Sequence, residues 1–133
     1  MIYVDASAFL ARYLSADRHH AQALKAFLKI QKNNLPIATS PFAIEETLTL
    51  LSRHTPMKFT ADIAQGLLHS QALTVMRAEP DDEWEALAWF KKFGGQGVRF
   101  KDCLSFALMK RHQIKKALAF CGVYSLVGFE HFS

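Results

Sequence analysis

Short apolar runs alternate along the chain with longer stretches in which apolar residues recur every three to four positions. The short runs are Ile2 to Val4, Ile37 to Thr39, Leu73 to Met76 and Ala117 to Phe120. Runs of this length, rich in β-branched and apolar residues, are typical of buried strands. The tail from Val127 to Phe132 can add an edge strand, so the pattern predicts four strands and a possible fifth.

Helical spacing predicts a helix in most of the intervals between these runs. Ser40 followed by Pro41 is a helix start, because serine caps a helix and proline suits its first turn. The helix that opens at Pro80 begins with acids, which suit the positive end of the helix dipole, and we expect it to bury Trp84, Leu87 and Ala88. Residues 94–97 form a glycine-rich loop. The predicted helices are 7–14, 17–33, 41–53, 60–70, 80–93 and 101–112.

The alternation of strands and helices predicts an α/β fold. Parallel neighbouring strands need helical crossovers, so we expect a short, mainly parallel sheet flanked by helices on both faces. The length of 133 residues, half of them hydrophobic, predicts a single domain that spans residues 1–133. Ligands of such sheets bind beyond the carboxyl ends of the strands, which directs attention to the residues that follow each strand.

Composition narrows the setting in which the protein works. No apolar run is long enough to cross a bilayer, and the first residues lack a secretory signal. The two cysteines, Cys103 and Cys121, are too few for a disulfide framework, so we expect a cytoplasmic protein without membrane contact. The net charge of +4 is compatible with binding a polyanion, although many basic domains bind none. The basic residues cluster on both sides of Asp102 at Lys91, Lys92, Arg99, Lys101, Lys110, Arg111, Lys115 and Lys116.

Three acids occupy positions that can converge on one site. Asp5 follows the first strand, and Asp102 lies in the first turn of its helix, although each position taken singly favours a helix cap. The apolar stripe of helix 41–53 separates its two neighbouring acids. Glu45 points away from the stripe, whereas Glu46 lies on its border, where a carboxylate can face a cleft or be an ordinary boundary residue.

Three segments resemble the sequence motifs of PIN-domain ribonucleases, and of the VapC toxins in particular. They are Ile2 to Leu10, Ser40 to Leu48 and Phe100 to Ala107, and they occur in the family's order along essentially the whole chain. The acids at matching positions are Asp5, Glu46 and Asp102. The resemblance implies a PIN-like three-layer α/β/α fold and a metal-dependent endoribonuclease.

The resemblance also implies a cofactor. Three carboxylates close together repel one another and need a cation, and hard oxygen ligands suit Mg2+ or Mn2+. We therefore predict that the catalytic and metal-binding residues are Asp5, Glu46 and Asp102. Ser7 and Ser105 are expected to hold water molecules or these ligands in place. The family usually has a fourth aspartate where this chain has Cys121. A neutral thiol is a poor ligand for Mg2+, so we expect a weaker or single metal site, with a preference for Mn2+, unless Cys121 only packs as a small hydrophobe.

The same resemblance implies RNA as substrate, a VapB-like antitoxin as partner and a homodimer. Arg99, Lys101 and the basic run after Lys110 are expected to guide the RNA backbone toward the acids. Two alternatives remain open. A catalytically weakened PIN-like domain would bind RNA or an antitoxin without cleavage, as Cys121 would favour. A phosphate-accepting signalling domain would require paired acids near the first strand and a lysine after the last, and the sequence has neither.

Overall fold

Five strands form one parallel sheet in the computed structural model, which describes all of residues 1–133. Their order across the sheet is β3-β2-β1-β4-β5, and every neighbouring pair is parallel. The bounds are β1 Ile2–Val4, β2 Ile37–Thr39, β3 Leu73–Val75, β4 Lys116–Leu118 and β5 Glu130–His131. With β1 at the centre, the residues that follow it lie in the middle of the carboxyl edge of the sheet.

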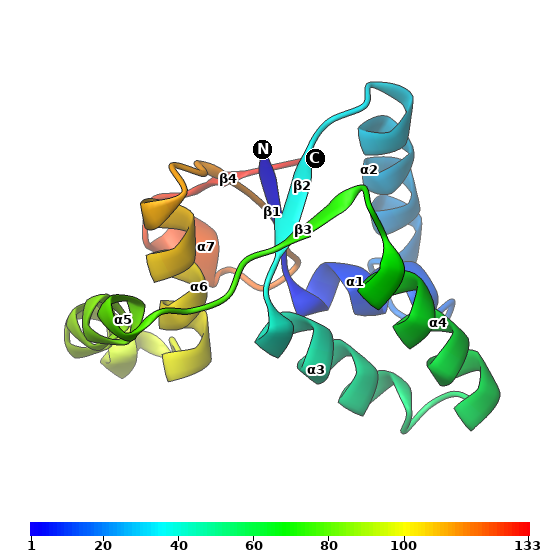
Figure 1. Cartoon of the computed structure of the whole chain (residues 1–133), viewed down its shortest axis with the longest axis horizontal. Helices are drawn as coiled ribbons and strands as arrows, with labels where there is room; N and C mark the ends of the chain where they lie inside the picture. The colour runs from blue at the N-terminus through cyan, green and yellow to red at the C-terminus, as the bar shows by residue number, and fades with distance from the viewer.

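Helices cover both faces of this sheet. Four helices, α1 to α4, gather on one side, and α5 to α7 gather on the other (Figure 1). This arrangement confirms the predicted three-layer α/β/α fold. The bounds are α1 Ala6–Tyr13, α2 His20–Lys32, α3 Pro41–Leu51, α4 Met57–His69, α5 Pro80–Phe93, α6 Phe100–Arg111 and α7 Val123–Leu126. No helix is both long enough and apolar enough to cross a membrane.

Alternate residues of the strands pack into two separate apolar cores, one on each face of the sheet. Ile2 and Val4 of β1 pack on the side of α1 and α2, together with Phe9 and Phe27. Tyr3, between them, points to the opposite core, which α5, α6 and α7 complete. Because successive strand residues point to opposite faces, a central strand of only three residues supplies both layers.

Helix α5 has the predicted bounds but buries a different face. Trp84 is 71% exposed and Ala88 is also exposed, so the prediction that they are buried was wrong. The buried positions are instead Asp82 and Ala86, with Trp89 packed beside them. Asp82 fixes this rotation, because its carboxylate accepts hydrogen bonds from the backbone N of Glu79 at 2.8 Å and from Arg111 Nε at 3.0 Å.

The remaining differences lie at the ends of elements. Helix α7 was not predicted, because four residues are too few to show a helical period. The predicted edge strand is present as β5, and the glycine-rich loop contains a single 3-10 turn, Gly94–Gln96. Helix α2 begins three residues later than expected, because Asp17 Oδ1 accepts a hydrogen bond from the backbone N of His19 at 2.8 Å in a preceding turn. Helix α4 begins three residues earlier, directly after Pro56.

Candidate active site

Asp5 follows β1 directly and is the N-cap residue of α1. Its Oδ2 accepts hydrogen bonds from the backbone N of Ser7 at 3.0 Å and from Ser7 Oγ at 2.7 Å. Its Oδ1 accepts a hydrogen bond from the Tyr124 hydroxyl at 2.8 Å. The side chain is buried, and these donors fix its orientation at the carboxyl edge of the sheet. The capping role considered from the sequence is real, and it places the carboxylate within the site.

Glu46 reaches the same region from α3. Ser40 caps this helix, because its Oγ accepts a hydrogen bond from the backbone N of Ala43 at 3.1 Å, and Pro41 occupies the first turn. Glu45 is exposed, whereas Glu46 is partly buried. The structure therefore confirms the distinction that helical periodicity made between the two acids.

Asp102 lies in the first turn of α6 and is almost fully buried. Its Oδ2 accepts a hydrogen bond from the backbone N of Arg99 at 3.0 Å, which closes the first turn of the helix. The Arg99 guanidinium folds back over the same carboxylate, with Nη2 at 3.3 Å from Oδ1. Asp102 therefore combines a capping role with an ion pair.

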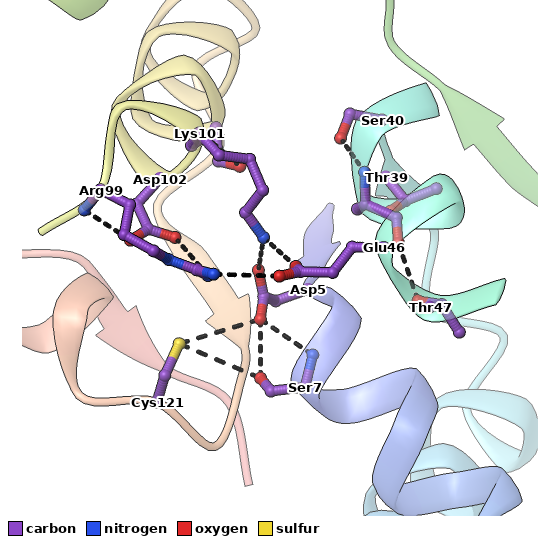
Figure 2. A network of polar contacts seen from close by, with 12 residues as sticks. Asp5, Ser7, Thr39, Ser40, Glu46, Thr47, Arg99, Lys101, Asp102 and Cys121 are labelled. Atoms are coloured by element: carbon purple, nitrogen blue, oxygen red, sulfur yellow. Dashed lines mark hydrogen bonds and ion pairs between the residues drawn. The ribbon is translucent and has the colours of Figure 1, made fainter. Parts of the chain in front are cut away.

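Two cationic side chains connect the three acids, as Figure 2 shows. The Lys101 ammonium pairs with Glu46 and lies 3.9 Å from Asp5 Oδ1. The Arg99 guanidinium joins Glu46 to Asp102, with Nη1 at 3.0 Å from Glu46 Oε1. Although burial acts to lower it, the pKa of Arg99 is raised by Asp102 and Glu46. The acids are thus brought to one place, but they meet through these cations, and no three acidic, histidine or cysteine side chains form a ready metal cage.

Cys121 and Ser7 support Asp5 from the side of β4. The backbone N of Phe120 donates to Ser7 Oγ at 3.0 Å, which ties the residues after β4 to the start of α1. Cys121 Sγ lies 3.8 Å from Asp5 Oδ2 and 4.0 Å from Ser7 Oγ. Burial, followed by the charge of Asp5, raises the pKa of Cys121 to about 11. At neutral pH the side chain is therefore a thiol beside Asp5 and carries no charge.

A buried hydroxyl network lies beneath the acids. The Tyr3 hydroxyl is 2.9 Å from Ser40 Oγ and 2.9 Å from Ser105 Oγ, so it connects α3 to α6. Burial raises the pKa of Tyr3 above its usual value and that of Tyr124 well above it, so both hydroxyls stay protonated. Ser105 thus supports the site through Tyr3 and has no hydrogen bond to an acid.

Sequence reasoning missed the role of Tyr124. The residue lies in α7, the helix that was not predicted, and its hydroxyl is one of the donors that hold Asp5. The available signal was an aromatic hydroxyl three residues after Cys121, close to the carboxyl end of β4.

Comparison with known proteins identifies the family to which this arrangement belongs. The family model of the PIN domain matches residues 2–120. The chain belongs to the PIN-domain family. It is similar to the 23S rRNA-specific endonuclease VapC20 of Mycobacterium tuberculosis strains H37Rv and CDC 1551, with 31% identity over 130 residues, 97% of this chain and 95% of the relative.

A solved structure gives the same result for the fold of this PIN-domain protein. The crystal structure of Mycobacterium tuberculosis VapC20, a Sarcin-Ricin loop cleaving toxin, superposes with a TM-score of 0.84 at 29% identity, covering 97% of this chain and 96% of that one. The resemblance to PIN-domain ribonucleases and VapC toxins that the motifs indicated is therefore confirmed.

PIN-domain nucleases generally use divalent metal ions, and the donors of this PIN domain are of a suitable kind. Asp5 and Glu46 direct carboxylate oxygens at one ammonium, so a positive charge is already stabilised between them. Carboxylate oxygens are the ligands that hard divalent cations prefer. The residues present therefore fit such an ion, provided that Lys101 and Arg99 move aside.

The basic run after Lys110 does not line this site, so that expectation was wrong. Lys115 and Lys116 lie at the amino end of β4, at the opposite edge of the sheet from Asp5, where they line a cavity with Met1 and Pro36. Lys110 and Arg111 are paired with acids of α5. Of the basic residues near Asp102, only Arg99 and Lys101 contact the acids of the PIN-domain site.

Proposed function

We propose that this protein is a metal-dependent endoribonuclease and the toxin of a VapBC-type toxin-antitoxin module. The observation that supports this most directly is that three acids from separate elements meet at the carboxyl edge of the sheet, where Lys101 joins Asp5 to Glu46 and Arg99 joins Glu46 to Asp102. That edge is where α/β folds place their active sites. Similarity to VapC20 over 97% of the chain supports the same assignment.

Asp5, Glu46 and Asp102 would hold the cation, Mg2+ or Mn2+. When bound, the ion supplies charge neutralisation and Lewis acidity at a phosphodiester. The protein keeps Asp5 in position with donors from Ser7 and Tyr124, so this ligand needs little reorganisation. Cys121 adds no negative charge beside Asp5, which favours a weak or single metal site and the softer Mn2+.

The substrate side of the site is basic. The Arg99 side chain is 59% exposed, and its planar guanidinium can pair with a phosphate through two hydrogen bonds. A single-stranded or splayed RNA segment would bring its backbone past this residue toward the acids. Because VapC20 acts on 23S rRNA, we propose ribosomal RNA as the first substrate to test.

The proposal extends to partners and location. A VapB-like antitoxin would cover the acids and block the RNA, and two copies of the chain would form a homodimer. The protein would work in the cytoplasm, where ribosomal RNA lies. Co-expression with a VapB-like antitoxin, followed by measurement of the mass of the purified assembly in solution, tests the partner and the homodimer, and fractionation of cells that express the protein tests the location.

Two adjacent acids of α3 provide a matched test of the catalytic assignment. Glu46→Gln removes a predicted ligand, whereas Glu45→Gln removes an exposed carboxylate one residue away on the same helix. We expect Glu46→Gln to lose Mn2+-dependent cleavage of a 23S rRNA fragment by at least about 100-fold, as loss of an electrostatic contact to the reacting group does. Glu45→Gln should stay within about threefold of wild type. Equal activities in both variants would contradict the assignment.

Cys121 favours a second candidate function. A PIN-like domain that binds RNA or an antitoxin without cleaving is favoured by the thiol beside Asp5 and by the two cations that already pair with the acids. In that case wild type binds RNA but does not cleave it, and Cys121→Asp creates Mn2+-dependent cleavage.

A further inference from the structure

The Lys101 ammonium contacts the carboxylates of both Asp5 and Glu46. It pairs with Glu46 and lies 3.9 Å from Asp5 Oδ1, between the two carboxylates (Figure 2). The Lys101 and Glu46 side chains are 21% and 22% exposed, so water screens the pair only partly. Lys101 directly precedes Asp102 in the first turn of α6, which keeps its backbone beside the site.

Arg99 plays a different part in the cluster. It contacts Glu46 and Asp102 but makes no ion pair with Asp5, and it is mostly exposed. Lys101 is therefore the side chain that lies between the carboxylates of β1 and α3. A divalent ion that uses oxygens of both Asp5 and Glu46 must displace the Lys101 ammonium, because two cations within a few ångström repel each other strongly.

A Lys101 ammonium that leaves the carboxylates needs another anionic partner. The side chain is a flexible four-carbon stem with a compact charge, so it can leave the carboxylates without a change in the backbone. A phosphodiester brought to the metal supplies a new anionic partner within reach. The same positive charge can thus serve first the acids and then the RNA.

We propose that Lys101 is a positioning residue that exchanges between two partners. Without a metal it pairs with Asp5 and Glu46, and when a metal binds it moves to the RNA phosphate next to the reacting one. This inference rests on the proposed ribonuclease function. It makes Lys101 a competitor of the metal and, at the same time, the residue that couples metal binding to RNA binding.

Two consequences distinguish this role from that of an ordinary surface lysine. Lys101→Met should bind Mn2+ about three- to tenfold more tightly than wild type, because the ion no longer competes with an ammonium. The same variant should lose part of the gain in nucleic-acid affinity that Mn2+ produces in wild type, because the released charge is missing.

The test compares Lys101→Met with Lys110→Met. Lys110 also forms an ion pair, with Glu85 at 2.7 Å, so both variants lose one positive charge that is paired with carboxylate. Mn2+ affinity is measured by calorimetric titration of metal-free protein. Binding of a fluorescein-labelled single-stranded DNA 12-mer, whose backbone offers phosphates that a ribonuclease should leave intact, is measured with and without Mn2+. Lys101→Gln repeats both measurements in case the apolar side chain alters folding.

The expected result is tighter Mn2+ binding and a smaller Mn2+-induced gain in oligonucleotide affinity for both Lys101 variants, with Lys110→Met like wild type. Equal or weaker Mn2+ binding by the Lys101 variants, or an undiminished gain, would overturn the Lys101 role. If wild type in that case still cleaves RNA in Mn2+, the proposed ribonuclease function is kept and only the Lys101 role is rejected. If neither wild type nor any variant binds Mn2+, both the Lys101 role and the metal-dependent function fail.

Discussion

Replacing Cys121 by aspartate places a second carboxylate beside Asp5, and the structure sets the size of the effect. Cys121 Sγ lies 3.8 Å from Asp5 Oδ2, so the new charge would lie about 4 Å from the existing one. Two like charges at that distance repel by about 4 kcal/mol at an effective dielectric of 20 and by about 1 kcal/mol in water. The Lys101 ammonium, 3.9 Å from Asp5 Oδ1, offsets part of this repulsion. We therefore expect Cys121→Asp to be less stable than Cys121→Asn by about 1 to 4 kcal/mol without metal.

The assay is urea unfolding of the two variants at pH 7, first with a chelator and then with Mg2+ or Mn2+. The asparagine variant matches the aspartate in shape, so the difference between them isolates the charge. A metal present at 100 times its dissociation constant stabilises the folded state by about 2.7 kcal/mol, and the aspartate variant should gain more than the asparagine variant. Equal stabilities in chelator would show that the two side chains do not face each other. A gap that metal leaves unchanged would show that position 121 does not share a cation with Asp5.

Two further predictions test the elements that hold the site. Tyr124→Phe removes the hydroxyl that donates to Asp5 Oδ1 at 2.8 Å. It should destabilise the fold by about 1.5 to 3 kcal/mol, as loss of a buried hydrogen bond to a charged group does. Urea unfolding measures this change, and a loss of stability below about 0.5 kcal/mol would contradict the contact. Although burial acts to raise it, hydrogen bonds from Arg111 and from the backbone N of Glu79 lower the pKa of Asp82. A carboxylate whose pKa is lower in the folded protein stabilises the fold at pH values above its unfolded pKa. This stabilisation is lost as the pH falls through the folded pKa. Asp82→Asn should therefore be less stable than wild type at pH 7, and the difference in the free energy of unfolding should shrink below about pH 4. A difference that does not change with pH would contradict this role of Asp82.

Local sequence signals predicted most of the fold correctly. Periodicity and capping identified the helices of both layers, and α5 matches its predicted bounds from Pro80 to Phe93. The rotation of α5 was not predictable from periodicity, because Trp84 and Ala88 fit an apolar stripe as well as Ala86 and Trp89 do. The choice depends on a contact between Asp82 and a residue on another helix, which spacing within one segment does not encode.

In the candidate site, too, local sequence features were predictable and contacts between distant segments were not. The positions of Asp5 and Glu46 followed from the end of a strand and from the border of an apolar stripe, both of which are local features. The pairing of Lys101 with both acids joins three elements that are distant in sequence, so it required the tertiary structure. Tyr124 was missed for the same reason, since its role depends on where α7 packs against β1.

We propose that Asp5, Glu46 and Asp102 cleave RNA together with a divalent cation. It is tested most directly by incubating a 23S rRNA fragment with wild type, Asp5→Asn and Cys121→Asp in Mn2+ and in chelator. Asparagine can still cap α1, so the Asp5 variant should keep its fold. We expect cleavage by wild type that requires Mn2+ and is lost in Asp5→Asn. Cleavage that persists in chelator or in Asp5→Asn would contradict it, and cleavage by Cys121→Asp alone would identify the natural protein as a binding domain.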